Sequence, residues 1–237
     1  MIIQTPAIVI SSLKYGETSK IVKCYTKSSG IKSFIAKGIY SKKNKTNPLF
    51  FSLNQIELVY EDKNTNGLEY FRGATQFLYY QTIHSSPQKT AITLFLSEIL
   101  NSVLQEEEPN AALFDFIASS FEAFDKKDSA YADFHLWFLI NLTKYVGFYP
   151  NIKHQSLYFD LTNGISSDIR PTESYISGNE LNDLKKLISL EFVKQYNNQF
   201  NHIQRKSLLN ILLKYYGLHI SGFRQPKSLN VLTVVFE

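Results

Sequence analysis

The stretch PAIVISSLKYGETSKIVKCYTKSSGIKSFIAKG, residues 6–38, decides the fold of the first part of the chain. It holds three short segments rich in Ile, Val, Phe, Tyr and Thr, at 6–14, 19–27 and 30–38, with turn residues between them. Such segments are typical of β-strands joined by hairpins. Two more follow at 53–61 and 68–80. Five short strands with a basic connection in the middle predict a barrel of the OB type, with an SH3-like barrel or a small open sheet as alternatives.

After residue 80 the sequence pattern becomes helical. From Ser86 onward apolar residues recur every three or four positions, which is the spacing of amphipathic helices. The predicted helices lie at 86–104, at 109–124, from about Asp128 to Gly147, from 179 onward and at about 202–218. Ser177 and Glu180 fit the capping-box pattern at the start of the fourth helix.

The remaining segments have weaker signals. Residues 148–178 contain prolines and glycines and are predicted to be irregular, with a short hairpin around LYFDLTNG, residues 157–164. The tail from Pro226 fits a helix or a strand. The chain is therefore predicted to be α+β, with a five-stranded OB-fold barrel at 1–80 and an all-helical domain at 81–237. Within that domain we expect a three-helix bundle at 86–147, the irregular segment at 148–178 and C-terminal helices at 179–237.

Composition places the chain among globular proteins of a reducing compartment. Of its 237 residues 44% are hydrophobic, which is enough to build a core. The single cysteine, Cys24, allows no internal disulfide, and its strand-like surroundings favour a buried side chain over a nucleophile. No apolar run is long enough to cross a bilayer, and no basic region precedes the first apolar residues. We expect a cytoplasmic protein with no membrane partner.

Charge is distributed unevenly along the chain. The net charge is +6 over residues 1–80, −5 over 81–150 and +3 over 151–237. The stretch GIYSKKNKTNPLF, residues 38–50, gathers Lys42, Lys43 and Lys45 in four positions between two strand-like segments. Clustered lysines gain affinity for nucleic acids by releasing the counterions of the phosphates, and exposed aromatic residues can stack on unpaired bases. The alternative is that the lysines keep the barrel soluble and the aromatic residues form its core.

Motifs of catalysis, cofactor binding or metal binding are absent from the sequence. There is no phosphate-binding loop, dinucleotide fingerprint, HExxH, GxSxG or CxxC. The five histidines are scattered, and none has another histidine or a cysteine at a metal-ligand spacing. We therefore assign no catalytic residue, no cofactor and no metal. An enzyme with an unrecognised site in the helical domain remains an alternative, as does an OB-fold protein that binds RNA or the ribosome.

Three stretches together resemble the RecO family of bacterial recombination mediators. The stretch AIVISSLKYGETSKIVKCYTKSSGIKSFIAKGIYSKKNK is similar to the family's first strand, Y-G-E-[TS] turn, second strand, T-x-x-x-G hairpin and basic K-G-x-x-[KR] loop. PLFFSLNQIELVY then matches a Pro followed by a strand, and LLKYYGLHISGFRQPKSLNVL matches the family's L-x-x-Y-x-x-x-H and [LP]-K-S pattern. The resemblance covers nearly the whole chain.

The resemblance implies a non-enzymatic protein of DNA repair and recombination in the bacterial cytoplasm, associated with the nucleoid. Such a protein binds single- and double-stranded DNA, anneals complementary strands and helps RecA to load. Its implied partners are RecR, in some settings RecF, and the C-terminal tail of the single-stranded DNA-binding protein. The implied DNA-binding residues are Lys37, Lys42, Lys43 and Lys45, with Lys14, Lys20 and Arg72 as weaker additions. Arg205 and Lys206 are candidates for binding the partner's tail peptide.

One departure from the family concerns zinc. Many relatives have a four-cysteine zinc module after the third helix, where this chain has YPNIKHQSLYFDLTNGISSD and no cysteine. A lone His154 cannot replace four thiolates. Packing and hydrogen bonds are therefore expected to order residues 150–176.

Overall fold

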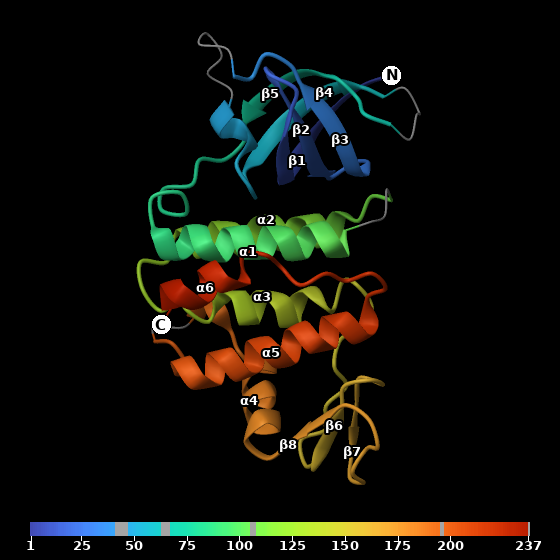
Figure 1. Cartoon of the computed structure of the whole chain (residues 1–237), viewed down its shortest axis with the longest axis vertical. Helices are drawn as coiled ribbons and strands as arrows, with labels where there is room; N and C mark the ends of the chain where they lie inside the picture. Colours follow the sequence, from blue (N-terminus) through green and yellow to red (C-terminus); the bar gives the residue numbers. More distant parts are fainter. Residues whose placement is uncertain (41–46, 63–66, 105–107, 195–196, 237) are drawn as a thin grey trace. The chain divides into compact units, whose positions relative to one another are not determined.

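The computed structural model describes residues 1–40, 47–62, 67–104, 108–194 and 197–236 (Figure 1). It divides into two compact units. The first comprises Met1–Lys126 and Pro226–Val235, and the second is built from Lys127–Gln225. The predicted domains, 1–80 and 81–237, divide the chain by type of secondary structure, and that division stays a prediction. Lys42, Lys43 and Lys45 lie outside the described residues.

Five antiparallel strands form the barrel of the first unit. They are β1 (Ile2–Tyr15), β2 (Ser19–Thr26), β3 (Gly30–Ala36), β4 (Gln55–Glu61) and β5 (Phe71–Gln76). Their order in the sheet is β3-β2-β1-β4-β5. Glu69, just before β5, closes the sheet on β3, because its N–H donates to the Ser33 carbonyl and its carbonyl accepts from the Ile35 N–H, both at 2.9 Å. The prediction of a five-stranded OB-type barrel is confirmed.

The barrel core follows the alternation expected of strands with one buried face. Val22 and Cys24 from β2, Phe34 and Ala36 from β3, and Leu58 from β4 are almost completely buried. Burial raises the pKa of the Cys24 thiol, because the thiolate would lose its hydration. The interpretation of Cys24 as a buried residue is therefore confirmed.

Three helices complete the first unit. They are α1 (Pro87–Val103), α2 (Ala111–Asp125) and α6 (Leu229–Phe236). The expected cap at Ser86 is present, since its hydroxyl accepts a hydrogen bond from the Lys89 N–H. Asn110 caps α2 in the same way. The tail that the sequence left undecided forms α6, and the Ser228 N–H before it donates to Glu98 at 3.2 Å.

The segment between β5 and α1 is tied to the end of α2. The Asp125 carboxylate accepts hydrogen bonds from the backbone N–H groups of residues 81–83 at 2.8 to 3.0 Å. The buried Lys89 ammonium donates to the carbonyls of Phe124 and Asp125, both at 2.9 Å. A cation at this position complements the negative end of the α2 dipole. The connection from barrel to helices is thus fixed within one unit.

The second unit combines helices with a small sheet. Its elements are α3 (Phe134–Leu142), β6 (Tyr158–Asp160), β7 (Ile165–Ser167), β8 (Tyr175–Ser177), α4 (Gly178–Ile188), the short 3₁₀ helix η2 (Phe192–Lys194) and α5 (His202–His219). The predicted hairpin around residues 157–164 is confirmed as β6 and β7. A third strand, β8, joins the other edge of β6, so the segment 148–178 is more regular than predicted.

One boundary prediction and one capping prediction in this unit are wrong. Helix α3 begins at Phe134 instead of Asp128, because Ala130 has a left-handed φ of 57° and cannot continue a helix. The capping box at Ser177 does not form, since the Ser177 side chain makes no capping hydrogen bond. Glu180 accepts a hydrogen bond from the Ser207 hydroxyl of α5 instead, at 3.2 Å.

Aromatic packing and hydrogen bonds order the segment 148–178, as expected from its lack of cysteines. The Tyr215 hydroxyl on α5 donates to the Phe148 carbonyl, and a ring nitrogen of His219 lies 2.9 Å from the Leu161 carbonyl. The rings of Phe148 and His219 stack with an interplanar angle of 4°. The Lys185 ammonium donates to the carbonyls of His154 and Ser156. In the part of the chain that the structure describes, no three His, Cys, Asp or Glu side chains are grouped to hold a metal ion.

Candidate nucleic-acid interface

The basic residues of the barrel fall into two groups, and those of the first group are engaged by other side chains. Lys27 forms an ion pair with Asp115 at 2.7 Å, and Lys32 lies 3.6 Å from the Glu69 carboxylate. Arg72, one of the predicted DNA-binding residues, pairs with Glu61 at 2.8 Å. An engaged cation has less charge to offer to a polyanion, so these residues are weaker candidates than their sequence positions indicate.

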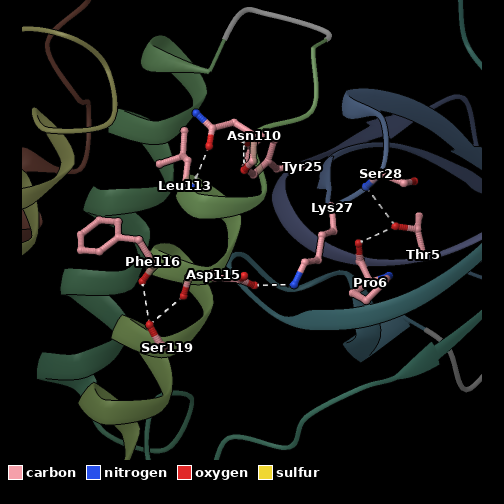
Figure 2. Close-up of polar contacts among 10 residues, drawn as sticks. All are labelled: Thr5, Pro6, Tyr25, Lys27, Ser28, Asn110, Leu113, Asp115, Phe116 and Ser119. Atoms are coloured by element: carbon pink, nitrogen blue, oxygen red, sulfur yellow. Dashed lines mark hydrogen bonds and ion pairs between the residues drawn. The ribbon is translucent and has the colours of Figure 1, made fainter.

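Two engaged lysines, Lys23 on β2 and Lys27 just after it, bind the barrel to the helices of its own unit. Figure 2 shows Lys27 reaching Asp115 of α2, and Tyr25 close to Asn110, the residue that caps α2. The Tyr25 hydroxyl donates to the Asn110 carbonyl at 3.2 Å. Lys23 donates to Asn101 at 3.0 Å and to the Leu104 carbonyl at 3.4 Å, at the carbonyl end of α1. Burial there lowers the pKa of Lys23. This side of β2 is therefore occupied by the protein itself.

The second group, Lys14, Lys20 and Lys37, lies at one end of the barrel. Lys14 on β1 is directly opposite Lys20 on β2, and Lys20 is directly opposite Ala36, the residue before Lys37. Among the residues that the structure describes, none forms an ion pair with these three lysines. Like charges directly opposite each other destabilise an antiparallel pair. A bound polyanion would relieve this repulsion.

Two tyrosine rings accompany these lysines. The Lys14 and Lys20 ammonium groups lie 5.9 and 5.5 Å from the centre of the Tyr40 ring. The Lys37 ammonium lies 4.6 Å from the centre of the Tyr70 ring. These distances are within the range of cation–π attraction. We call Lys14, Lys20, Lys37, Tyr40 and Tyr70 the lysine–tyrosine cluster.

The cluster is held by the backbone of the barrel. The Tyr40 N–H donates to the Thr18 carbonyl in the β1–β2 turn at 3.4 Å. Tyr70 follows Glu69, whose backbone closes the barrel on β3. Burial lowers the pKa of Lys20. The predicted basic arm, with Lys42, Lys43 and Lys45, follows Tyr40 in the sequence, so the cluster lies where the chain enters the arm.

The two residues predicted to bind a partner peptide have different surroundings. The Arg205 guanidinium is 3.6 Å from the buried Asp133 carboxylate and also donates to the Phe200 carbonyl. Burial raises the pKa of Asp133 in spite of the hydrogen bond from the Gln199 N–H and the charge of Arg205. Arg205 is therefore part of the internal structure of the second unit. Lys206, its neighbour, is exposed.

Sequence reasoning named the three lysines of the cluster, but it missed which lysines of the barrel are engaged and which face each other. A signal for the facing pair was present. Lys14 and Lys20 lie three residues on either side of Glu17 in the turn 16–18, so a symmetric hairpin places them opposite each other. No comparable signal linked Lys27 to Asp115, because 88 residues separate them.

The fold and comparisons with known proteins together define the class of the protein. Residues 1–78 match the model of the N-terminal region of recombination protein O, and residues 84–229 match the model of its C-terminal region. An OB-type barrel followed by a helical region agrees with both matches. The class is that of DNA repair and recombination proteins.

Full-length relatives identify the family. The chain is 41% identical over 239 residues to the DNA repair protein RecO of Christiangramia forsetii. It is 39% identical to that of Flavobacterium johnsoniae and 34% identical to that of Bacteroides fragilis, each over 242 residues. Each comparison covers 100% of both chains. The chain belongs to the RecO family of DNA repair proteins, and the resemblance found in the sequence is confirmed. No described helix has both the length and the apolar character that crossing a bilayer requires.

Proposed function

We propose that this RecO family protein is a non-enzymatic recombination mediator whose barrel, residues 1–80, binds single- and double-stranded DNA. In this account it anneals complementary strands and helps RecA to load in the bacterial cytoplasm, at the nucleoid. The observation that carries the proposal is the lysine–tyrosine cluster, where three lysines without an ion pair to a described residue lie at one end of an OB-type barrel.

Phosphate contacts explain how the protein would act on any DNA. Lys14, Lys20 and Lys37 meet the phosphates, and the arm residues Lys42, Lys43 and Lys45 extend the same charge along the chain. Contacts to phosphates position a strand without reading its bases, so binding is independent of sequence. Arg72 contributes less, because Glu61 already neutralises it.

Annealing follows from the same charges. Two DNA strands repel each other, and a protein that holds both lowers the repulsion and raises their local concentration. The experiment mixes two complementary strands that carry a fluorescence donor and acceptor, with wild type or with the variant K14Q/K20Q/K37Q. We expect wild type to accelerate annealing and the variant to lose most of the acceleration. Equal rates with and without wild type would reject the proposal.

The choice between DNA and RNA needs its own measurement, since phosphates are common to both. Competition between single-stranded DNA and RNA of the same length for the full-length chain separates the two. Preference for DNA supports the repair role. Preference for RNA supports the alternative of an RNA- or ribosome-associated OB protein.

Partner binding is assigned to the second unit and to the family's pathway. The proposed partners are RecR, in some settings RecF, and the C-terminal tail of the single-stranded DNA-binding protein. A labelled tail peptide is titrated with wild type, Lys206→Gln and Lys194→Gln. Lys206 is exposed, whereas the exposed Lys194 pairs with Glu191 at a charged surface and serves as a control. We expect weaker binding for Lys206→Gln only, and no saturable binding to wild type would refute the assignment.

A further inference from the structure

We infer that Tyr40 and Tyr70 are base-stacking residues, and that the lysines over their rings contact the phosphates of the same strand. The inference rests on the proposed function and deepens it. The ligand at this end of the barrel is then a strand with unpaired bases. The tyrosines bind its bases and the lysines bind its phosphates.

Exposure distinguishes these two tyrosines from the aromatic residues of the barrel core. Phe34, Phe50 and Tyr60 are at most 1% exposed and are packing residues. Tyr40 is 42% exposed and Tyr70 is 47% exposed, although both are attached to ordered parts of the barrel. Such rings contribute little to the core, while they present apolar area on which a flat base can stack.

With its lysine, each exposed ring can contact both parts of a nucleotide, the base and the phosphate. An ammonium group within 6 Å of the ring centre is held there by the ring quadrupole. In a nucleotide the base and the phosphate are joined by one sugar. A base that stacks on the ring therefore brings its phosphate close to the lysine. Tyr40 offers this arrangement with Lys14 and Lys20, and Tyr70 offers it with Lys37.

The two tyrosines belong to one surface. Tyr40 is three residues after Lys37, and Lys37 lies over the ring of Tyr70. Lys20 lies near Tyr40 and is paired in the sheet with Ala36, the residue before Lys37. A single strand that lies along this end of the barrel can thus contact both rings.

Duplex DNA cannot use this surface in the same way. Its bases are stacked on each other and must leave the helix before a side chain can stack on them, which costs free energy. A duplex therefore meets the lysines alone, whereas a single strand meets lysines and rings. Each stacked base is expected to raise affinity by roughly 5- to 150-fold.

The experiment compares three ligands of the same length, about 12 nucleotides, which is within the site size of one OB barrel. They are single-stranded oligo-dT, an abasic strand with the same phosphates, and a duplex, each titrated with the full-length chain by fluorescence anisotropy. The variants are Tyr40→Ala, Tyr70→Ala and the conservative Tyr40→Phe. Tyr79→Ala is the matched control, because Tyr79 is 74% exposed and has no lysine over its ring among the described residues.

We expect wild type to bind oligo-dT at least fivefold more tightly than the abasic strand. Tyr40→Ala and Tyr70→Ala should each lower the affinity for oligo-dT by at least fivefold and leave that for the abasic strand and the duplex within twofold. Tyr40→Phe and Tyr79→Ala should behave as wild type. Equal binding of oligo-dT and the abasic strand to wild type would overturn the inference. So would an equal loss on all three ligands, because the rings would then only hold the lysines.

The outcomes also separate this inference from the proposed function. Strong, salt-dependent binding of wild type to the abasic strand, with no preference for bases, would refute stacking and leave phosphate binding intact. Absence of binding to all three ligands would refute both.

Discussion

Replacing Gly164 by Ala tests whether side-chain packing orders the segment 148–178, which contains no cysteine. Gly164 lies in the β6–β7 turn with a left-handed φ of +68°, and a Cβ at this position would lie 2.7 Å from the Tyr215 hydroxyl. Tyr215 cannot easily move away, because it is buried and its ring is 4.3 Å from that of His219. Its hydroxyl also donates to the Phe148 carbonyl at 2.9 Å.

The expected loss has two parts. A left-handed backbone costs a residue with a Cβ about 1–2 kcal/mol. Displacing Tyr215 breaks its hydrogen bond to Phe148, which costs a further ~0.5–1.5 kcal/mol. Gly164→Ala should therefore lower the free energy of unfolding by about 1.5–3.5 kcal/mol. Gly222→Ala is the matched control, since Gly222 has a φ of +72° and open space around its Cβ position, and it should show the first part alone.

Unfolding in urea can be followed through the fluorescence of Trp137, the only tryptophan, which stacks on Phe192 in the same unit. A second background sharpens the test. The Tyr215→Phe protein lacks the hydroxyl that the new Cβ would meet. In that protein, Gly164→Ala should lower the free energy of unfolding by no more than Gly222→Ala does. The reasoning is refuted if Gly164→Ala and Gly222→Ala have equal costs in the wild type, or if Tyr215→Phe leaves the cost of Gly164→Ala unchanged.

Three further outcomes are expected. Burial alone would raise the pKa of the Asp125 carboxyl, but the hydrogen bonds from residues 81–83 outweigh burial and lower this pKa below the ordinary 3.8. Asp125 therefore stabilises the folded protein above pH 3.8, and this stability is lost as the pH falls through the pKa of the folded state. Urea unfolding at several acidic pH values should show this loss in wild type and a flatter profile in Asp125→Asn. Glu17→Gln should tighten oligo-dT binding, because it removes a carboxylate from the turn between Lys14 and Lys20; weaker binding would contradict the placement of the strand at this end of the barrel. Arg72→Gln should change oligo-dT affinity less than Lys20→Gln, since Glu61 already neutralises Arg72, and a larger effect would show that the ion pair opens for DNA.

The barrel could be predicted from the sequence because its signals are local. Alternating apolar residues and the YGE and SSG turns define β1 to β3 within one continuous stretch. The full length of β1 could not be predicted in this way. It begins at Ile2, four residues before the predicted start, because Ile2–Ile8 pair with β4, and that pairing depends on residues 55–61.

The helical part shows where local signals fail. The start of α1 follows from Ser86 and Pro87, which act on their own helix. The start of α3 depends on the left-handed Ala130 and on the buried Asp133, which accepts from the Gln199 N–H. Such a long-range contact has no local signature.

The candidate site also depends on long-range contacts that the sequence does not reveal. Its lysines are visible in the sequence, but their availability depends on partners that only the fold brings near. Lys27 and Arg72 differ from Lys14 and Lys20 because Asp115 and Glu61 lie beside them. Charge counts along the chain cannot show that difference.

The salt dependence of oligo-dT binding tests the central claim most directly, with wild type, K14Q/K20Q/K37Q and the control Lys27→Gln, whose lysine pairs with Asp115. Three lost phosphate contacts should lower the slope of log affinity against log salt by about 2, at roughly 0.7 for each contact with a single strand. Between 50 and 200 mM salt, wild type should then lose about 20-fold more affinity than the triple variant, while Lys27→Gln follows wild type. A triple variant with the slope of wild type, or an equal reduction in Lys27→Gln, would contradict the claim that the open lysines of the barrel bind DNA.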